Sequence, residues 1–380
     1  MQIEDKLSEK DFHNFKILKK YLLKYTKRAY LVGGAVRDIY LNNSIKDLDI
    51  EVYDIEPAKF DKILRDFGAI GVGKNFFVYK WKNIDISLPR VEKKTGIGHR
   101  AFDVQITFDE KEASKRRDFT MNALMLNIFN TGLLDFWGGK TDIENKIIKI
   151  VDDRSFKEDS LRVFRAVQFS ARFGFKCDEK SISLMQQIDL KDLSKERIFW
   201  ELEKLFKARY LHYGFYYFIR VAIMRKLFKI DIACKDFYKI TKELILHQKN
   251  FVSKYYQYYF LYILSKFLDE DINKWLKLLN APKEYEKIYK LQPKLPKSIN
   301  DRFLLETSLK IPINSWLENY NPNIKKRAIE LGIFKNKFKT DVNALDVLKN
   351  NFKGIDIAVE IKRRELEFID KYIDSVIPQT

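Results

Sequence analysis

A short segment near the N-terminus joins a strand pattern to the start of a helix through two glycines. Residues 30–32 (Tyr-Leu-Val) are apolar, as in a short buried strand, and Gly33 and Gly34 end it. An apolar stripe at helical spacing begins at about Ala35. A glycine turn leading into a helix offers backbone N–H groups and a partial positive charge, which favour phosphate. Arg37, one turn into this helix, could add a bidentate contact to phosphate oxygens.

Two carboxylates follow in the segment 46–53, which is predicted to be a strand. Because side chains alternate along a strand, Asp47 and Asp49 share one face, while Leu48 and Ile50 point to the core. Two carboxylates about 7 Å apart on one face can bind a divalent metal ion. Alone, this pattern is more typical of a solvated strand edge. Beside a phosphate-binding turn, it indicates a site for a nucleoside triphosphate and Mg²⁺.

Two further motifs carry arginines. Arg116 and Arg117 begin the motif R-R-D-F-T-M-N, in which paired arginines could bind a triphosphate and Asn122 could reach a ribose hydroxyl. The alternative is a basic surface turn. In residues 158–172, helical spacing makes Asp159 and Arg162 neighbours on one face. The alternative there is a salt-bridged exposed face, which contributes little to stability.

These motifs resemble those of the polymerase β-type nucleotidyltransferase superfamily. More narrowly, they are similar to the class II tRNA nucleotidyltransferases (CCA-adding enzymes) and bacterial poly(A) polymerases. The matching motifs are G-G-x-V-R-D with a following D-x-D, R-R-D-F-T-M-N-A, L-D-F-W-G-G-K, E-D-x-x-R and E-R-I-x-x-E-L. They occur in family order over residues 30–202, about 45% of the chain.

The resemblance implies an enzyme that adds CCA to the 3′ end of tRNA from CTP and ATP without a template and releases pyrophosphate. It implies Mg²⁺ as cofactor, with Asp47 and Asp49 as its ligands and Asp85, on a neighbouring strand, as a third carboxylate. A surface aspartate is the alternative for Asp85. The implied nucleotide-binding residues are Gly33, Gly34, Arg37, Arg117, Asp118, Asn122, Asp159, Arg162, Arg165 and Gln168.

Within that set, the resemblance assigns the choice of base to Asp159 and Arg162, and a phosphate or ribose contact to Arg165. The family often has an arginine three positions later, where this chain has Gln168, which can still donate one hydrogen bond. In the motif E-R-I-x-x-E-L, Ser194 is predicted to cap a helix on which Arg197 and Glu201 form a supporting i,i+4 pair.

Several outputs remain compatible with these motifs. The enzyme could be an A-adding or CC-adding specialist, or a poly(A) polymerase. A catalytically silent RNA-binding protein on the same scaffold is the alternative from another class. None of the four histidines is followed by Asp, so we do not expect the H-D phosphohydrolase that some relatives append.

Composition agrees with a folded protein that binds a polyanion. The chain has 380 residues, 46% hydrophobic residues and a net charge of +18, although a compositional bias towards lysine would give the same charge. Two widely spaced cysteines indicate a reducing compartment, and we expect a cytoplasmic protein. The most apolar run, residues 255–264, is about half as long as a membrane span, so we expect no membrane association.

The element pattern predicts an α+β fold: a mixed α/β nucleotidyltransferase head, then an elongated all-helical neck, body and tail. Expected strands are 30–32, 46–53, 76–81 and 84–88, and expected helices are 8–25, 34–41 and 57–67. Residues 90–115 are expected to form an irregular loop that could move during turnover, which in the resembled family helps the change from adding C to adding A.

The predicted division is an N-terminal helix (1–28), the head (29–142), a neck with the nucleotide-recognition motif (143–210) and a tRNA-binding body and tail (211–380). Lysines and tyrosines in 283–297 and lysines in 324–339 could follow a phosphate backbone, or simply form solvated helix faces. The pattern is compatible with a monomer or a homodimer.

Overall fold

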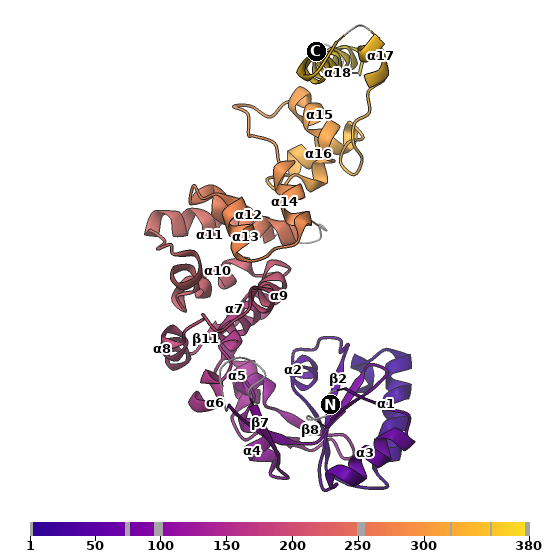
Figure 1. Cartoon of the computed structure of the whole chain (residues 1–380), viewed down its shortest axis with the longest axis vertical. Coiled ribbons are helices and arrows are strands. Elements are labelled where there is room, and N and C mark those ends of the chain that lie inside the picture. The colour runs from indigo at the N-terminus through magenta and orange to yellow at the C-terminus, as the bar shows by residue number, and fades with distance from the viewer. Residues whose placement is uncertain are drawn as a thin grey trace. The chain divides into compact units, whose positions relative to one another are not determined.

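The structure is a computed structural model that describes residues 3–72, 77–94, 102–248, 255–319, 321–349 and 352–376. The chain forms two compact units, Met1–Ile232 and Ala233–Thr380. The first unit begins with a mixed sheet and continues as helices, and the second is helical (Figure 1). The predicted α+β class is therefore confirmed.

A seven-stranded sheet forms the N-terminal part of the first unit within the described residues, in the order β3-β4-β5-β2-β1-β8-β9. Its strands are β1 (Ala29–Val32), β2 (Leu48–Val52), β3 (Ile70–Gly71), β4 (Val78–Trp81), β5 (Ile84–Ser87), β8 (Met125–Asn127) and β9 (Leu133–Leu134). Strands β2 and β5 are parallel, and the other neighbours are antiparallel. Strand β2 is central, so its backbone pairs with β5 on one side and β1 on the other, and its side chains project from the two faces of the sheet.

Three helices accompany the first strands: α1 (Glu9–Leu22), α2 (Gly34–Tyr40) and α3 (Pro57–Asp66). Helix α1 begins after Ser8 because the Ser8 hydroxyl accepts a hydrogen bond from the Asp11 N–H at 3.2 Å. These helices and the strands β1, β2, β4 and β5 confirm the elements predicted for residues 8–88, with ends that differ by a few residues.

The loop predicted for residues 90–115 is wrong over its described part. Strands β6 (Arg90–Lys94) and β7 (Phe102–Ile106) pair antiparallel, and helix α4 (Glu110–Lys115) follows. The sequence of β6 is mostly charged, so it shows none of the apolar alternation that marks a strand. It is a strand because its backbone pairs with β7, the next strand in the chain. The glycines at 96 and 98, which suggested a loop, lie outside the described residues.

Helices form the rest of the first unit: α5 (Gly139–Glu144), α6 (Asp153–Lys157), α7 (Leu161–Phe173), α8 (Glu179–Gln187), α9 (Lys195–Phe206) and α10 (Leu211–Arg220). A short parallel pair joins β10 (Ile147–Ile148) to β11 (Lys176–Cys177). Helix α7 packs against α9 and α10. Its contact with α10 is close, because a Cβ on Gly214 would lie 2.9 Å from the Cβ of Ala171.

The short turns of the first unit complete its path. They are the 3₁₀ turns η1 (Glu4–Lys6) and η2 (Thr120–Asn122) and the π-helical turn η3 (Met224–Phe228). Helix α7 ends at Gly174, which has a left-handed φ of +69°.

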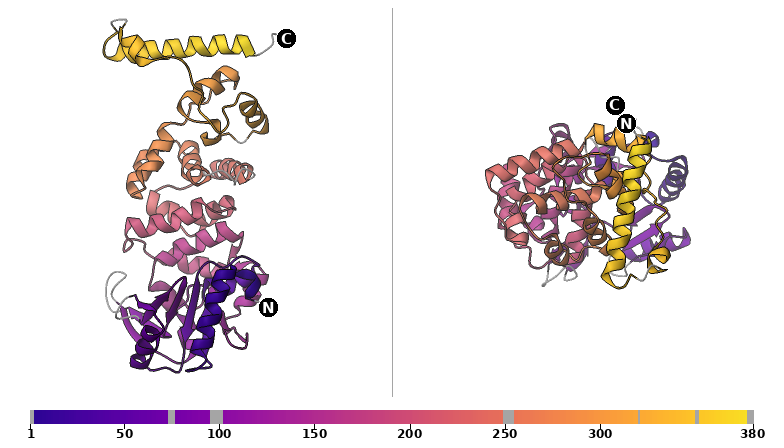
Figure 2. Two further views of the ribbon diagram at one scale, coloured as in Figure 1. Left: turned by 90° about the vertical axis from the view of Figure 1, so that its right-hand side faces the viewer. Right: turned by 90° about the horizontal axis from the view of Figure 1, so that it is seen from above.

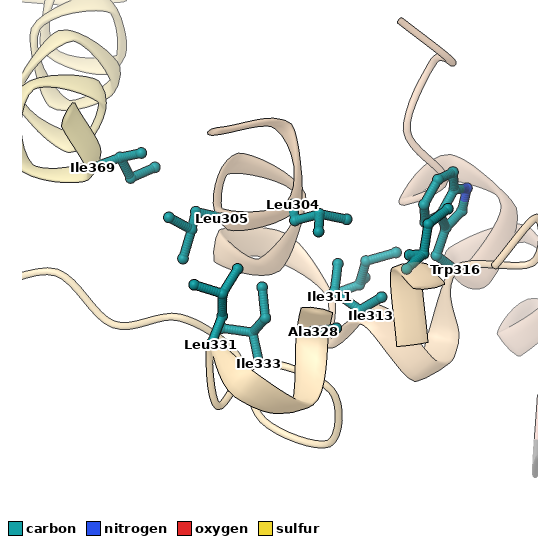
Figure 3. Packing of buried hydrophobic residues seen from close by; sticks show 10 residues of the cluster. Leu304, Leu305, Ile311, Ile313, Trp316, Ala328, Leu331, Ile333 and Ile369 are labelled. Atoms are coloured by element: carbon teal, nitrogen blue, oxygen red, sulfur yellow. The ribbon is translucent and has the colours of Figure 1, made fainter. Parts of the chain in front are cut away.

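The second unit contains helices and 3₁₀ turns. They are α11 (Cys234–Gln248), η4 (Tyr256–Tyr258), α12 (Tyr259–Phe267), α13 (Ile272–Leu278), α14 (Lys283–Lys290), α15 (Asp301–Lys310), η5 (Ile313–Ser315), α16 (Pro322–Glu330), α17 (Ala344–Lys349) and α18 (Ile355–Val376). Figure 2 shows α18 as one continuous helix. One of its cores gathers side chains around Leu305, Ile313 and Trp316 (Figure 3).

Buried aromatic rings explain two features of the second unit. The apolar run 255–264 forms η4 and the start of α12, with Tyr258, Tyr259 and Phe260 fully buried. Tyr285 and Tyr289 are also buried, so these two tyrosines of segment 283–297 belong to the core. The lysines of the same segment are exposed to solvent. Among the described residues, no helix is both long and apolar enough to cross a membrane.

Gly139 sets how closely α5 approaches η2. Both carboxylate oxygens of Asp135 accept hydrogen bonds at the start of α5, from the N–H of Gly139 at 2.8 Å and of Lys140 at 3.0 Å. A Cβ on Gly139 would lie 2.2 Å from the carbonyl oxygen of Thr120, the first residue of η2. No side chain fits there without moving η2.

We therefore expect Gly139→Ala to lower the free energy of unfolding by about 1–3 kcal/mol, the usual cost of overpacking. Urea denaturation of the full chain measures this loss. Gly71→Ala is the matched control, because a Cβ there would make ordinary contact, at 3.4 Å, with the Tyr79 ring. Equal unfolding midpoints for Gly139→Ala and the wild type would contradict the steric argument.

Candidate functional site

A pocket of about 470 Å³ opens in the first unit between strand β2, the turn before α2, the segment 116–122 and helices α7 and α9. Eleven of the thirteen predicted site residues line it; Asp47 and Asp85 lie outside the lining that the structure describes. The lining residues are Gly33, Gly34, Arg37, Asp49, Arg116, Arg117, Asp118, Asn122, Asp159, Leu161, Arg162, Arg165, Gln168, Phe169, Arg172 and Lys204.

The glycine turn lies against two of the predicted functional side chains. Gly33 has a φ of +69°, a conformation that side chains rarely adopt, and it immediately precedes α2. A Cβ on Gly33 would lie 3.5 Å from Nη1 of Arg117 and 3.7 Å from Oδ2 of Asp49. The backbone of the turn is therefore in close reach of one cation and one carboxylate.

The three predicted metal carboxylates lie on neighbouring strands. Asp49 of β2 is in direct register with Asp85 of the parallel strand β5, and Asp47 immediately precedes β2. Asp85 also lies 3.8 Å from Nζ of Lys80 on β4. Among the described residues, no three acidic, histidine or cysteine side chains converge as a ready-made metal cluster. The carboxylates thus form a row rather than a closed cage.

Asp49 lines the pocket without a direct protein partner for its carboxylate. No hydrogen bond or ion pair joins it to another described residue. Desolvation raises the pKa of Asp49; the positive charge of Arg117 opposes this rise, and the negative charges of Asp85, Asp47 and Glu51 add to it. Such crowding of negative charge favours the binding of a cation.

Glu51 anchors two arginines of the pocket, and the sequence analysis missed it. Its carboxylate is 1% exposed and pairs with Nη2 of Arg116 at 2.7 Å and Nη2 of Arg117 at 2.6 Å. Burial raises the pKa of Glu51, but the two guanidinium groups lower it further, to below its ordinary value. The alternation D-L-D-I-E could have identified it, because Glu51 shares a strand face with Asp47 and Asp49.

A buried chain of polar groups connects α2 with α7. Arg37 donates from Nη1 to the amide oxygen of Asn122 at 2.7 Å, and the Asn122 amide donates to Asp118 at 2.9 Å. Asp118 in turn accepts from Nε of Arg165 at 2.6 Å. Burial raises the pKa of Asp118, but Arg165 and the hydrogen bond from Asn122 lower it below its ordinary value. Both ends of the Asn122 amide are engaged within the protein.

Asp159 and Arg162 line the pocket but do not form the i,i+3 helical pair that their spacing predicts. Helix α7 begins at Leu161, so Asp159 precedes it and accepts the Leu161 N–H at 3.2 Å. Both Asp159 oxygens accept from Nη2 of Arg197 at 3.1 Å. Arg162 donates instead to the carbonyl oxygens of Ser155 at 2.9 Å and Arg116 at 2.7 Å.

On helix α9, the structure confirms the predicted cap but not the predicted i,i+4 pair. Ser194 caps α9 as predicted, by accepting the N–H of Arg197 at 3.4 Å. The predicted Arg197–Glu201 pair is wrong, because Arg197 reaches Asp159 and Glu201 binds Nζ of Lys204 at 2.7 Å. Packing of α9 against α7 brings a distant carboxylate to Arg197.

Two stacked phenylalanine rings on α7 contact three of the arginines that line the pocket. Phe169 and Phe173 stack with their centroids 5.8 Å apart. The guanidinium carbons of Arg37 and Arg165 lie 5.2 and 5.1 Å from the Phe169 centroid. Arg172 lies 5.0 Å from that of Phe173. These distances are within the range of cation–π contacts, so the rings fix the directions of the guanidinium groups.

Gln168, on the same helix, is 1% exposed, and its Oε1 has no hydrogen-bond partner among the described residues. The sequence analysis assigned no role to Phe169, Arg172 and Lys204, which also line the pocket. Helical spacing from Arg165 would have found the first two, since they lie four and seven residues on.

Residues 29–149 match the family described as the poly A polymerase head domain. The chain is 36% identical over 223 residues to a CCA-adding enzyme of Buchnera aphidicola subsp. Cinara cedri, covering 56% of this chain and 52% of that protein. It is 34% identical over 210 residues to a multifunctional CCA protein of Haemophilus ducreyi, covering 53% and 50%. The matches thus span about half the length of these curated relatives.

The fold is similar to those of solved CCA-adding enzymes. The Bacillus stearothermophilus enzyme in complex with CTP gives a TM-score of 0.68 at 21% identity, over 94% of this chain and 92% of that chain. The Thermotoga maritima enzyme complexed with tRNA gives 0.67 at 19% identity, over 98% and 97%. The resemblance carried by the motifs is thus confirmed. Residues 29–149 match the poly A polymerase head domain, and the chain is similar in sequence to CCA-adding enzymes and multifunctional CCA proteins.

Proposed function

We propose that the protein is a CCA-adding tRNA nucleotidyltransferase, which extends the 3′ end of tRNA with CTP and ATP and releases pyrophosphate. The observation that carries this proposal is the convergence in one pocket of Asp49, Arg117, Asp159 and Arg162. One nucleotide bound in this pocket would then meet a carboxylate that can bind metal, a cation that can bind phosphate, and two groups that can recognise the base. The names of the relatives, and structures solved with CTP, ATP or tRNA, support the same substrates.

The residues present fit a magnesium ion. Asp49 has carboxylate oxygens without a hydrogen-bond or ion-pair partner among the described residues, and desolvation, together with the charges of neighbouring carboxylates, raises its pKa. Mg²⁺ is usually held by one or two carboxylates, with water and substrate phosphates as its other ligands, so an open row suits it better than a cage. Asp47 and Asp49 would hold it, with Asp85 beside them. Bound Mg²⁺ would neutralise triphosphate charge and lower the pKa of the primer 3′-hydroxyl.

The protein's own groups would position the triphosphate. Glu51 fixes Arg117 next to Gly33, so a guanidinium and the backbone of the turn face the same space. The 3′-hydroxyl of the RNA would lose its proton to solvent as its oxygen forms a bond to the α-phosphorus, and the bond from that phosphorus to the pyrophosphate oxygen would break. Positioning and charge stabilisation suffice for this step, so no covalent protein nucleophile is required.

Base selection is assigned to Asp159 and Arg162. Arg162 is held by two carbonyl oxygens, and Asp159 by Arg197, so neither side chain is free to adapt to any base. Fixed donors and acceptors distinguish the edges of C and A from those of G and U. Arg197 acts as a positioning residue in this scheme, because it acts through Asp159.

We place this reaction in the cytoplasm. Both cysteines are free thiols: Cys177 is buried and Cys234 is exposed. This agrees with a reducing compartment.

Asp49→Asn should lower nucleotide incorporation into a tRNA that lacks CCA by at least about 100-fold, because it removes a metal carboxylate worth several kcal/mol of charge stabilisation. Incorporation of radiolabelled CTP and ATP measures it, with tRNA binding as the test of folding. Asp66→Asn, an exposed position at the end of α3, is the matched control. Wild-type incorporation by Asp49→Asn would refute the metal assignment.

Arg197→Met should release Asp159 and weaken base selection. A hydrogen bond to a charged group contributes about 1.5–3 kcal/mol, so we expect kcat/KM for CTP and ATP to fall by about tenfold or more. Misincorporation of UTP and GTP should rise relative to the correct nucleotides. Arg220→Met is the control. It breaks the ion pair between Arg220 and Glu179, whose N–O distance is 2.7 Å and whose residues do not line the pocket. Unchanged selectivity in Arg197→Met would show that Asp159 needs no positioning partner.

A further inference from the structure

Most cations that line the pocket are already bonded within the protein. Their partners are carboxylates or backbone carbonyls: Glu51 for Arg117 (2.6 Å), Asp118 for Arg165 (2.6 Å), Asp38 for Arg37 (3.0 Å), Glu201 for Lys204 (2.7 Å) and the Ser155 carbonyl for Arg162 (2.9 Å). Arg172 differs, because no hydrogen bond or ion pair joins its guanidinium to any residue that the structure describes.

The position of Arg172 is nevertheless well defined. It lies in the last turn of α7, two turns after Arg165 on the same side of the helix. Its guanidinium carbon is 5.0 Å from the Phe173 centroid and 5.9 Å from the Phe169 centroid. The stacked rings thus support one face of the guanidinium, while the side chain remains exposed where it lines the pocket.

The electrostatic surroundings of Arg172 favour an added anion. Desolvation in the pocket and the neighbouring charge of Arg37 lower the pKa of Arg172, and the weaker effects of Asp38 and Glu201 oppose this. A guanidinium keeps its proton at neutral pH, so its charge remains without a bound partner in the described part of the chain. A phosphate oxygen pair would supply the bidentate partner that its N–H groups can bind.

We propose that Arg172 binds a phosphate group of the substrate in this pocket. The inference rests on the proposed function, because nucleotide transfer brings two sources of phosphate here: the triphosphate of CTP or ATP, and the 3′-terminal phosphodiester of the RNA. Both present the same oxygens to the guanidinium. Arg172 is then a binding residue from the last turn of α7, two turns beyond Arg165, to which the resemblance gives a phosphate or ribose contact.

The test compares Arg172→Gln and Arg172→Lys with the wild type in two equilibrium binding measurements, one with ATP and CTP and one with tRNA lacking CCA. Arg154→Gln is the matched control, because Arg154 is an exposed arginine of α6 in the same unit and outside the pocket lining. Urea unfolding midpoints establish that each variant is folded.

We expect Arg172→Gln to weaken one ligand by about tenfold or more, the loss of one charge-assisted contact. Weaker nucleotide binding assigns the triphosphate as the source. Weaker tRNA binding, with the slope of log K against log salt smaller by about 0.7–0.9, assigns the RNA phosphodiester. Arg172→Lys should keep most of that slope but lose part of the affinity, since it retains the charge without the planar fork.

Binding of both ligands by Arg172→Gln as tightly as by the wild type, or a loss no larger than that of Arg154→Gln, would overturn the proposal. The readout is independent of catalysis. A wild type that binds nucleotide and tRNA but adds no nucleotide defeats the proposed function and leaves the Arg172 assignment to be decided by binding. A wild type that binds neither ligand overturns both.

Discussion

A buried carboxylate, Glu51, joins the central strand of the sheet to the arginines that follow α4. A charge that is 1% exposed is tolerated only when it is paired, and Glu51 is paired with two guanidinium groups. Asp49, the proposed metal ligand, lies two residues earlier on the same strand, so this ion pair also sets where Arg117 lies relative to Asp49 and the glycine turn. Loss of Glu51 would leave Arg117 unpaired beside them.

The same principle extends across the pocket. Apart from Arg172, the arginines that line the pocket each have an acidic or carbonyl partner, so their positions are fixed before any substrate arrives. Preorganised charges of this kind need little rearrangement when negative charge develops during reaction. The Asn122 amide has a related role. By accepting from Arg37 and donating to Asp118, it connects the helix after the glycine turn with α7. The proposed phosphate, metal and base functions therefore share one polar framework.

The sequence identified the local parts of this site but not their partners. Periodicity along one strand placed Asp49, because such spacing depends on backbone geometry alone, and the motif resemblance placed Arg165. The Asp159–Arg197 pair joins residues 38 positions apart, and only the packing of α7 against α9 brings them together. Strand β6 escaped prediction for a similar reason, since its mostly charged sequence carries no periodic signal and its partner is β7. Glu51 and Arg172 were missed for a different reason. Strand spacing from Asp49 and helical spacing from Arg165 would have placed them in the site, but neither residue belongs to a family motif.

The measurement that tests the central claim most directly is the product formed by the wild-type protein from each nucleotide alone and from CTP with ATP. The acceptors are tRNA transcripts that end before CCA and after CC. We expect CTP to add two residues to the first acceptor, ATP to add one to the second, and the mixture to complete CCA and stop. Use of ATP alone on the CC-ended tRNA would indicate an A-adding specialist, and long A tails a poly(A) polymerase. No incorporation, with tRNA binding retained, would contradict a catalytic role altogether.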